Sequence, residues 1–374
     1  VYRSLTEAVE AGMITEDQID ISLKKLLKIQ FRLGMFDPQD KVPYSKIGAE
    51  VLESKPHQQQ ALKMARQSMV LLKNEKQLLP LSSKIKKIAL LGPNANNGTT
   101  QLGNYNGIPS KNATLLDALR AEKGIEVVYD SISDFITLQP GIDLQHYAEK
   151  YKDVDLIIYA GGISALLEGE EGDTGNVEGF YRGDRTTINL PAVQTQVMQM
   201  LQKSGKPMIF ICMSGSAIAF NWESQHIPAI IQAWYGGQAA GTALADILFG
   251  RYNPSGKLPI TFYRSDSDLP AIEDYSMKNR TYRYFNGDVL YPFGYGLSFT
   301  KFKFKKLNVP QEVQIGDTIN ISTEVVNTGK SAGEEVIQLY LSHKDIAPEA
   351  PNSQLVGFQK VMLQPGERKI VHFK

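Results

Sequence analysis

The sequence contains one cysteine, Cys212, in 374 residues. The chain therefore cannot form an intrachain disulfide or a cysteine-based zinc site. Cys212 lies in the apolar run 207–213, which predicts a small buried side chain. Because a protein without disulfides can function in either redox environment, the cysteine count does not select a compartment.

The chain also lacks an excess of charge and a long apolar run. Forty basic residues balance forty acidic ones, so no overall field attracts nucleic acid or anionic lipid, and a neutral substrate is favoured. No apolar run approaches the roughly 18 residues that a membrane helix needs, which predicts no membrane span. The N-terminus, which begins at Val1, shows no signal-peptide pattern.

The length predicts two or three domains. A capping-box pattern, Thr15 to Gln18, opens a helix near the N-terminus. Apolar residues then recur at helical spacing: Ile19, Leu23, Leu26, Leu27 and Phe31. Residues 1–40 are too few to cover this stripe, so we interpret them as the terminal helices of a preceding domain, followed by a linker over 41–56.

Residues 57–265 alternate between apolar strand patterns and helical patterns. This alternation predicts an α/β domain with an open, mostly parallel sheet sandwiched by helices. The predicted helices cover 59–73, 192–203 and 238–249. The predicted strands are Lys87–Leu91, Glu126–Tyr129, Asp155–Ala160, Pro207–Met213, Ala229–Trp234 and Leu258–Phe262.

The composition changes after Asp266. Residues 266–301 are rich in aromatic and turn residues and predict a connector packed on the α/β domain. Residues 302–374 alternate polar and apolar side chains with turns at short intervals, which indicates part of an immunoglobulin-like or fibronectin-like β-sandwich.

The most unusual segment is the loop 161–185, which follows the predicted strand Asp155–Ala160. It contains four glutamates and two aspartates among seven glycines. Open α/β sheets bind ligands at the carboxyl ends of their strands, so its position and composition both indicate a site. A solvated acidic loop is the simpler alternative. The acids do not have the spacing of a calcium loop, and we predict no metal site.

Two other turns follow predicted strands. The turn Gly92 to Gly98 matches neither the dinucleotide nor the P-loop pattern, so we expect no nucleotide cofactor. The turn Ser214-Gly-Ser216 lacks the G-x-S-x-G elbow of a serine hydrolase. A nucleotide-binding protein is therefore the least favoured class.

The ordered set of motifs resembles glycoside hydrolase family 3, the β-glucosidases and β-xylosidases. The matching segments are Val70 to Asn74 (VLLKN), Gly92-Pro-Asn-Ala95, Gly103-Asn-Tyr-Asn-Gly107, Trp234-Tyr-Gly-Gly-Gln238, Ala243 to Gly250 (ALADILFG), Asn253-Pro-Ser-Gly-Lys257 and Tyr291 to Leu297 (YPFGYGL). The resemblance implies a (β/α)8 barrel, an α/β sandwich and a fibronectin III-like domain. The first helices of this chain would then be the end of a missing barrel.

The resemblance also implies site residues. In this family an aspartate nucleophile lies in the barrel, and the sandwich loop carries the acid/base glutamate. Glu170 is the best match for that glutamate, with Glu168 and Glu171 as alternatives. Asp184 and Arg185 resemble a family feature that either orders the loop by an ion pair or contacts substrate.

The resemblance implies a retaining β-glycosidase that acts on β-linked oligosaccharides, with β-xylosidase favoured over β-glucosidase. Retention needs two carboxyl groups roughly 5 to 5.5 Å apart, so a chain without the nucleophile is expected to be inactive alone. The family resemblance implies a periplasmic or extracellular location, and the oligomeric state stays open. The alternative function is a non-catalytic carbohydrate-binding or scaffolding module.

Overall fold

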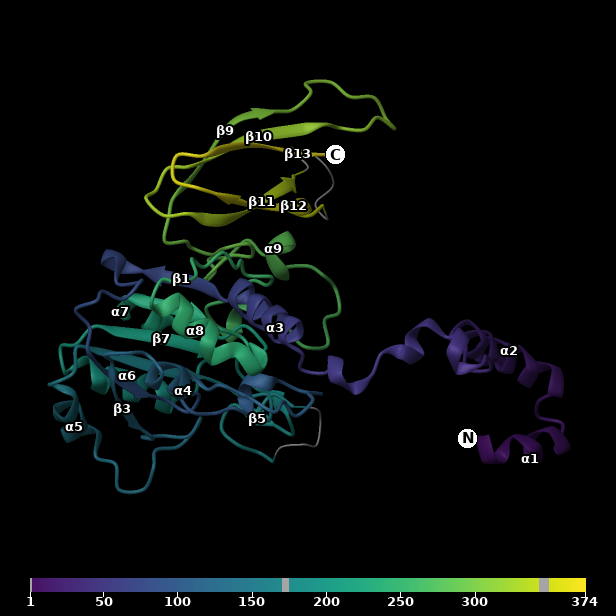
Figure 1. The fold of residues 1–374 in the computed structure, drawn as a ribbon, viewed down its shortest axis with the longest axis horizontal. Helices are drawn as coiled ribbons and strands as arrows, with labels where there is room; N and C mark the ends of the chain where they lie inside the picture. Colours follow the sequence, from purple (N-terminus) through teal and green to yellow (C-terminus); the bar gives the residue numbers. More distant parts are fainter. Residues whose placement is uncertain (1, 170–174, 343–349) are drawn as a thin grey trace. The chain divides into compact units, whose positions relative to one another are not determined.

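The computed structural model describes residues 2–169, 175–342 and 350–374. The chain divides into two compact units, Val1–His57 and Gln58–Lys374. The first unit contains η1 (Tyr2–Ser4), α1 (Leu5–Glu10), α2 (Glu16–Arg32), η2 (Gln39–Lys41), η3 (Pro43–Lys46) and η4 (Ala49–Val51) (Figure 1).

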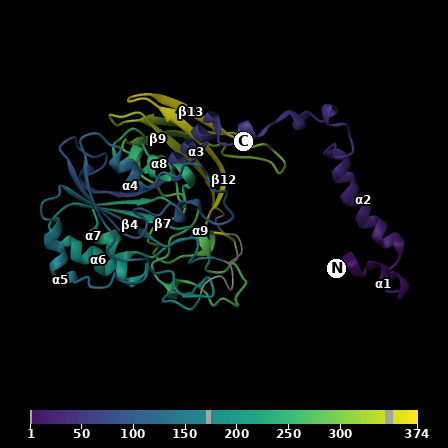
Figure 2. The ribbon, with the colours of Figure 1, turned by 60° about the horizontal axis from the view of Figure 1, so that its bottom comes forward.

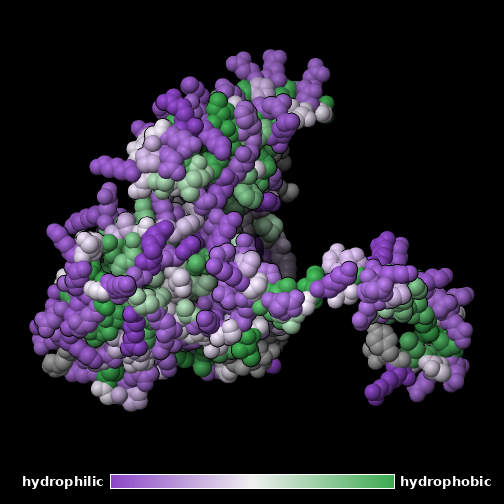
Figure 3. Space-filling view, viewed as in Figure 1, coloured by the Kyte–Doolittle hydropathy of each residue, from purple (hydrophilic) through white to green (hydrophobic). Residues whose placement is uncertain are grey.

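The predicted capping box at the start of α2 is confirmed. The Thr15 hydroxyl accepts from the Gln18 backbone N–H at 3.3 Å, and the Gln18 side chain accepts from the Thr15 N–H at 2.9 Å. None of the residues of α2 is buried. Leu26, Ile29 and Phe31 are 54%, 57% and 64% exposed, and the space-filling view shows hydrophobic atoms along this helix (Figure 3).

The second unit is built on a six-stranded sheet in the order β1-β8-β7-β4-β2-β3. All neighbouring strands are parallel except β1 and β8, which are antiparallel. The strands are β1 (Val70–Asn74), β2 (Lys87–Leu91), β3 (Glu126–Asp130), β4 (Leu156–Gly162), β7 (Met208–Met213) and β8 (Ala229–Gln232). The predicted open, mostly parallel sheet is therefore confirmed.

Helices cover both faces of this sheet (Figure 2). One face packs against α3 (Lys55–Ser68), α4 (Leu115–Arg120) and α8 (Ala240–Leu248). The opposite face packs against α5 (Leu144–Tyr147), α6 (Ala192–Gln202) and α7 (Asn221–His226). Alternate residues of one strand enter the two cores, as Phe210 and Ile211 of β7 show, because successive side chains point to opposite faces.

Two elements differ from the sequence predictions. The predicted helix 59–73 ends at Ser68, and Val70–Asn74 forms the antiparallel edge strand β1. Val70, Leu71 and Leu72 are buried there, so pairing with β8 overrides the helical pattern. The predicted strand Leu258–Phe262 makes only an isolated bridge, between Phe262 and Tyr291, because its partner is the connector rather than the sheet.

The connector runs back to the sheet edge before the last domain begins. Leu297 donates its backbone N–H to the carbonyl of Leu71 in β1 at 2.8 Å. The connector includes η9 (Asp266–Asp268) and α9 (Thr281–Tyr284). The connector is therefore a packed part of the unit, joined to the edge of the sheet.

The last domain contains two small sheets, β13-β10-β9 and β11-β12. Its strands are β9 (Phe302–Asn308), β10 (Ile321–Asn327), β11 (Gly333–Leu341), β12 (Gln354–Leu363) and β13 (Arg368–Phe373). Val325, Ile337 and Leu363 belong to its small core. The Glu334 carboxylate accepts from the Tyr252 hydroxyl at 2.9 Å, which links this domain to the sandwich.

Candidate active site

The candidate site begins at the end of β4, one of the two strands that flank the point where the strand order reverses. From β2 the chain passes to β3 on one side of the sheet and then to β4 on the other, and such a switch point opens a crevice at the carboxyl ends of the strands. Gly162 ends β4 with φ 107°, and a Cβ there would lie 2.1 Å from the carbonyl oxygen of Met213 in β7. Glycine is therefore required for the backbone to leave the sheet at this point.

The acidic residues of the loop follow this glycine. A turn forms in which the backbone N–H groups of Leu167 and Glu168 donate to the carbonyl of Ser164, at 3.0 and 3.1 Å. The chain returns through a short hairpin of β5 (Phe180–Tyr181) and β6 (Asp184–Arg185). Glu170 and Glu171 lie outside the described residues, whereas Glu168 lies inside them.

The Glu168 side chain is held by three donors from neighbouring strand ends. Its Oε1 accepts from the Gly215 backbone N–H at 2.6 Å and from the Tyr235 hydroxyl at 2.5 Å. Its Oε2 accepts from the Ser216 hydroxyl at 2.5 Å. Gly215 and Ser216 follow β7, and Tyr235 follows β8. The carboxylate thus fastens the first part of the acidic loop to the ends of two parallel strands.

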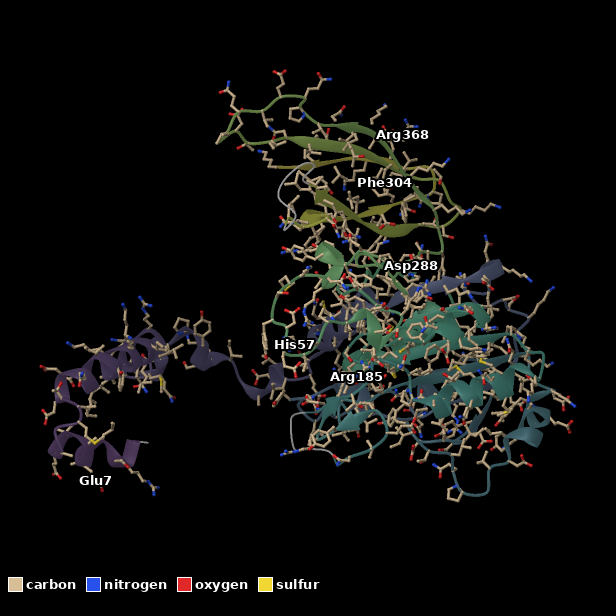
Figure 4. All side chains as sticks on the ribbon, turned by 180° about the vertical axis from the view of Figure 1, so that it is seen from behind. Glu7, His57, Arg185, Asp288, Phe304 and Arg368 are labelled. Atoms are coloured by element: carbon tan, nitrogen blue, oxygen red, sulfur yellow. The ribbon has the colours of Figure 1, made fainter. Side chains whose placement is uncertain are left out.

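Arg185 extends the same network from the returning hairpin, and Figure 4 labels its position. Its Nη1 donates to the Ser216 hydroxyl and to the Ala217 carbonyl, both at 2.8 Å. Ser216 therefore bridges Glu168 and Arg185. The Nε and Nη2 atoms of Arg185 are buried and have no hydrogen-bond partner among the described residues. Buried side-chain donors nearly always have an acceptor, so two unsatisfied donors on one arginine are unusual.

Burial shapes the electrostatics of this cluster. It lowers the pKa of the Arg185 guanidinium, and the negative charge of Glu168 opposes that shift. Burial also raises the pKa of Tyr235, and the charge and hydrogen bond of Glu168 raise it further. Tyr235 therefore stays neutral and donates to Glu168 over the physiological range.

The backbone before Tyr235 adopts a costly conformation. Trp234 has φ 54°, in the left-handed region that bulky residues rarely occupy. Its indole N–H donates to the carbonyl of Ser68 at 3.0 Å. Such backbone conformations cost on the order of 1–3 kcal/mol and occur preferentially at functional sites, and here the turn presents Tyr235 to Glu168.

Asp184 is separate from this network. It is exposed and pairs with Tyr181 across the β5–β6 hairpin. Among the described residues, no contact joins its carboxylate to the Arg185 guanidinium. The two neighbours in sequence thus have different surroundings, and only Arg185 reaches the strand ends.

Sequence reasoning missed the partners of Glu168. It assigned Ser214–Ser216 to a turn and treated Tyr235 only as part of a motif. One signal in the sequence could have found them: both segments directly follow predicted apolar strands. In a parallel sheet, the carboxyl ends of all strands point to the same side, where ligands bind. The remaining information, that β7 pairs with β4 and that β8 follows β7 on the same side, comes from the sheet order.

The comparisons with known proteins agree with this architecture. The model of the glycosyl hydrolase family 3 C-terminal domain matches residues 69–299, and that of the fibronectin type III-like domain matches residues 335–374. The chain belongs to glycosyl hydrolase family 3. The resemblance read from the sequence motifs is confirmed.

Several named relatives are β-xylosidases or β-glucosidases. A xylan 1,4-beta-xylosidase of Xylanibacter ruminicola is 32% identical and aligns with 100% of this chain and 59% of its own length. A beta-xylosidase of Formosa agariphila is 33% identical, over 95% of this chain and 49% of its own length. A periplasmic beta-glucosidase of Salmonella typhimurium is 32% identical, over 98% and 51% respectively. The chain therefore spans about half the length of the curated relatives it matches.

Solved structures show the same relation. A β-glucosidase from Erythrobacter marinus superposes with a TM-score of 0.84 at 30% identity, covering 100% of this chain and 52% of that one. A family 3 exo-β-xylosidase in complex with a xylobiose aziridine probe also gives 0.84, at 26% identity over 98% of this chain and 50% of that one.

Two further findings concern metals and membranes. Within residues 2–169, 175–342 and 350–374, no group of three or more histidine, cysteine, aspartate or glutamate side chains could hold a metal ion. In the same ranges, no helix is both long and apolar enough to span a bilayer.

Proposed function

We propose that this chain is the acid/base-delivering part of a retaining β-glycosidase, with Glu170 as the acid/base residue. The observation that carries the proposal is the anchoring of Glu168 by Gly215, Ser216 and Tyr235. This anchor fixes the loop two residues before Glu170, at the carboxyl ends of the strands, where α/β folds bind their ligands.

The anchor also supports choosing Glu170 over Glu168. A general acid must give its proton to the leaving-group oxygen and later remove one from water, so a carboxyl oxygen has to face the substrate. Both oxygens of Glu168 accept hydrogen bonds within the protein. Glu168 then anchors the loop, and Glu170 is the group that exchanges the proton. Glu171 is the remaining alternative for that role.

The nucleophile is proposed to lie in a preceding barrel domain. The exposed apolar stripe of α2 supports this, because a helix with such a stripe is stable when another element covers it. In the two-carboxylate mechanism the nucleophile approaches from the opposite side of the sugar, roughly 5 to 5.5 Å from the acid/base. This chain alone is therefore proposed to be inactive.

The proposed substrate is a β-linked xylo-oligosaccharide rather than a β-glucoside. The names of two relatives support this, a xylan 1,4-beta-xylosidase and a beta-xylosidase, while the periplasmic beta-glucosidase keeps the hexose as the second candidate. That relative's name also supports a periplasmic or extracellular location. Arg185 is proposed to order the loop, since it binds Ser216 and Ala217.

The test compares glutamine variants in the protein that includes the preceding domain. Glu170→Gln should lower kcat for xylobiose about 10²- to 10⁴-fold, the usual contribution of a general acid/base. The loss should be smaller in the glycosylation step of a substrate with an activated leaving group, because such a group departs without a proton. The first sugar released, observed by NMR, should have the β configuration.

Asp184→Asn serves as the matched control in the same loop, while Glu168→Gln and Glu171→Gln test the two alternative glutamates. If Glu171→Gln rather than Glu170→Gln shows the leaving-group dependence, the assignment moves by one residue. If Glu170→Gln only raises KM, the loop binds carbohydrate without catalysing the reaction. Turnover by residues 1–374 alone would overturn the proposed role of a second domain.

A further inference from the structure

A cavity of about 630 Å³ lies in the Gln58–Lys374 unit, between the segment that follows β6 and the connector. Its lining includes Arg185, Thr187, Asp266, Tyr275, Met277 and Arg280. The volume falls within the roughly 300–1,000 Å³ that is usual for small-molecule sites. Its connector wall has no part in the mechanism described above.

Hydrogen bonds fasten the connector to the sandwich at one end of the cavity. The Asp266 carboxylate accepts from the Thr187 hydroxyl at 2.6 Å, from the Ile188 backbone N–H at 2.7 Å and from the Asn189 side-chain amide at 3.2 Å. The two walls of the cavity are therefore joined by three bonds to one side chain.

Arg280 fixes the other end of the connector wall. Its Nη2 donates to the carbonyls of Asp274 and Ala271, at 2.6 and 3.2 Å, and its Nε donates to the carbonyl of Ser276 at 3.2 Å. One guanidinium thus binds three carbonyls of the loop 271–276, so the wall is preformed.

The residues on either side of Arg280 have left-handed backbone conformations. Asn279 and Thr281 have φ 55° and 56°, and this region is costly for the β-branched Thr281. The Thr281 backbone N–H donates to the Tyr263 hydroxyl at 2.7 Å. Backbone strain held in place by specific hydrogen bonds is typical of a site that must keep its shape.

The wall presents apolar side chains to solvent beside balanced charges. Ile272 is 85% exposed, Tyr275 92% and Met277 48%. The charged side chains of the lining are two arginines, Arg185 and Arg280, and two aspartates, Asp266 and Asp274. An exposed aromatic and apolar rim over hydrogen-bonding groups with no net charge suits a neutral, hydroxyl-rich ring with an apolar face.

The location of the cavity decides which sugar it would hold. Arg185 lines it and is joined through Ser216 to Glu168, the anchor of the acid/base loop. The general acid protonates the oxygen of the leaving group, so a leaving sugar meets the domain that carries the acid. Resting on the proposed function, we infer that this cavity is the subsite for the leaving-group sugar, with Tyr275 as the platform beneath its ring.

The test separates substrates that fill this subsite from one that does not. In the protein that includes the preceding domain, Tyr275→Ala should lower kcat/KM for xylobiose about tenfold, which corresponds to about 1.4 kcal/mol. It should leave β-xylosyl fluoride unchanged, because fluoride is too small to reach Tyr275. Tyr275→Phe keeps the ring and should retain most of the activity, and Met277→Ala should show a smaller loss of the same kind.

Phe358→Ala is the matched control, since Phe358 is also a largely exposed aromatic residue, in β12 of the last domain. This variant should leave kcat/KM unchanged for both xylobiose and β-xylosyl fluoride. Equal losses for xylobiose and the fluoride, or a lowered melting temperature with no substrate preference, would show that Tyr275 supports packing and would overturn the subsite. A wild-type protein that hydrolyses neither these xylosides nor the corresponding glucosides would instead refute the proposed function, and the subsite with it.

Discussion

Helix α2 has an apolar stripe and helix α8 is apolar along most of its length, yet their surroundings differ completely. Helix α8 buries all its residues except Thr242, whereas α2 buries none of its residues. Helix α2 begins with a full capping box, and α8 has no side-chain cap. The comparison teaches that α8 is stabilised by tertiary packing, and α2 within this chain by local interactions.

The largest expected effect tests this contrast directly. Leu244→Ala in α8 should lower the free energy of unfolding of the chain by about 2–5 kcal/mol, because it leaves a cavity in a fully buried site. Leu26→Ala in α2, where the side chain is 54% exposed, should change it by about 0.5 kcal/mol or less. Urea unfolding of both variants gives the comparison, and equal losses would contradict it.

A second prediction extends the contrast to the candidate site. Glu168→Ala should lower the free energy of unfolding by about 1–3 kcal/mol, because Gly215, Ser216 and Tyr235 lose their shared acceptor. Glu178→Ala, an exposed glutamate of the same loop, should have little effect. If the two variants are equally stable in urea, Glu168 does not anchor the loop.

A third prediction concerns a buried acid of the sandwich. Burial raises the pKa of Glu223, against the opposing hydrogen bond from Thr195. A raised pKa means that its contribution is fully present below the unfolded value of 4.5 and is lost as the pH rises through the folded value. Glu223→Gln should therefore gain stability relative to wild type above pH 4.5, by at most about 1.4 kcal/mol per pH unit.

Asp130 provides a control of opposite sign. Burial alone would raise the pKa of its carboxyl, but hydrogen bonds from Lys150, Tyr147 and Tyr151 hold it below its ordinary value. Its contribution is therefore present above the unfolded pKa and is lost as the pH falls through the folded pKa. The advantage of wild type over Asp130→Asn should shrink in acid. Urea unfolding between pH 3 and 7 measures both differences, and curves of the same sign would contradict the assignments.

The smallest effect is expected at the start of α2. Thr15→Ala removes the acceptor for the Gln18 N–H and should destabilise this helix by about 0.5–1 kcal/mol. Circular dichroism at 222 nm should show a small loss of helix, while the unfolding midpoint of the sandwich stays constant. A shift of that midpoint would mean that the two units unfold together.

The sequence alone predicted much of the fold, because the patterns involved are formed by residues close together in the chain. Alternating apolar strands and helices indicated the mostly parallel sheet, and Thr15 and Gln18 identified a helix start that needs only neighbouring residues. Val70–Asn74 was missed because an apolar edge strand directly after a helix continues the same pattern. Its pairing with Ala229–Gln232 depends on residues far away in the chain.

For the candidate site, the sequence by itself supplied the residue types on which the proposed chemistry rests, and the tertiary structure decided the partners of Glu168. The glutamates of the loop and the family motifs can be recognised from residue types and their order along the chain. That Glu168 meets Gly215, Ser216 and Tyr235 follows from the order β8-β7-β4 in the sheet, because a parallel sheet places the carboxyl ends of neighbouring strands side by side. The spacing of these residues along the sequence does not reveal that order, so only the folded chain shows which residues hold Glu168.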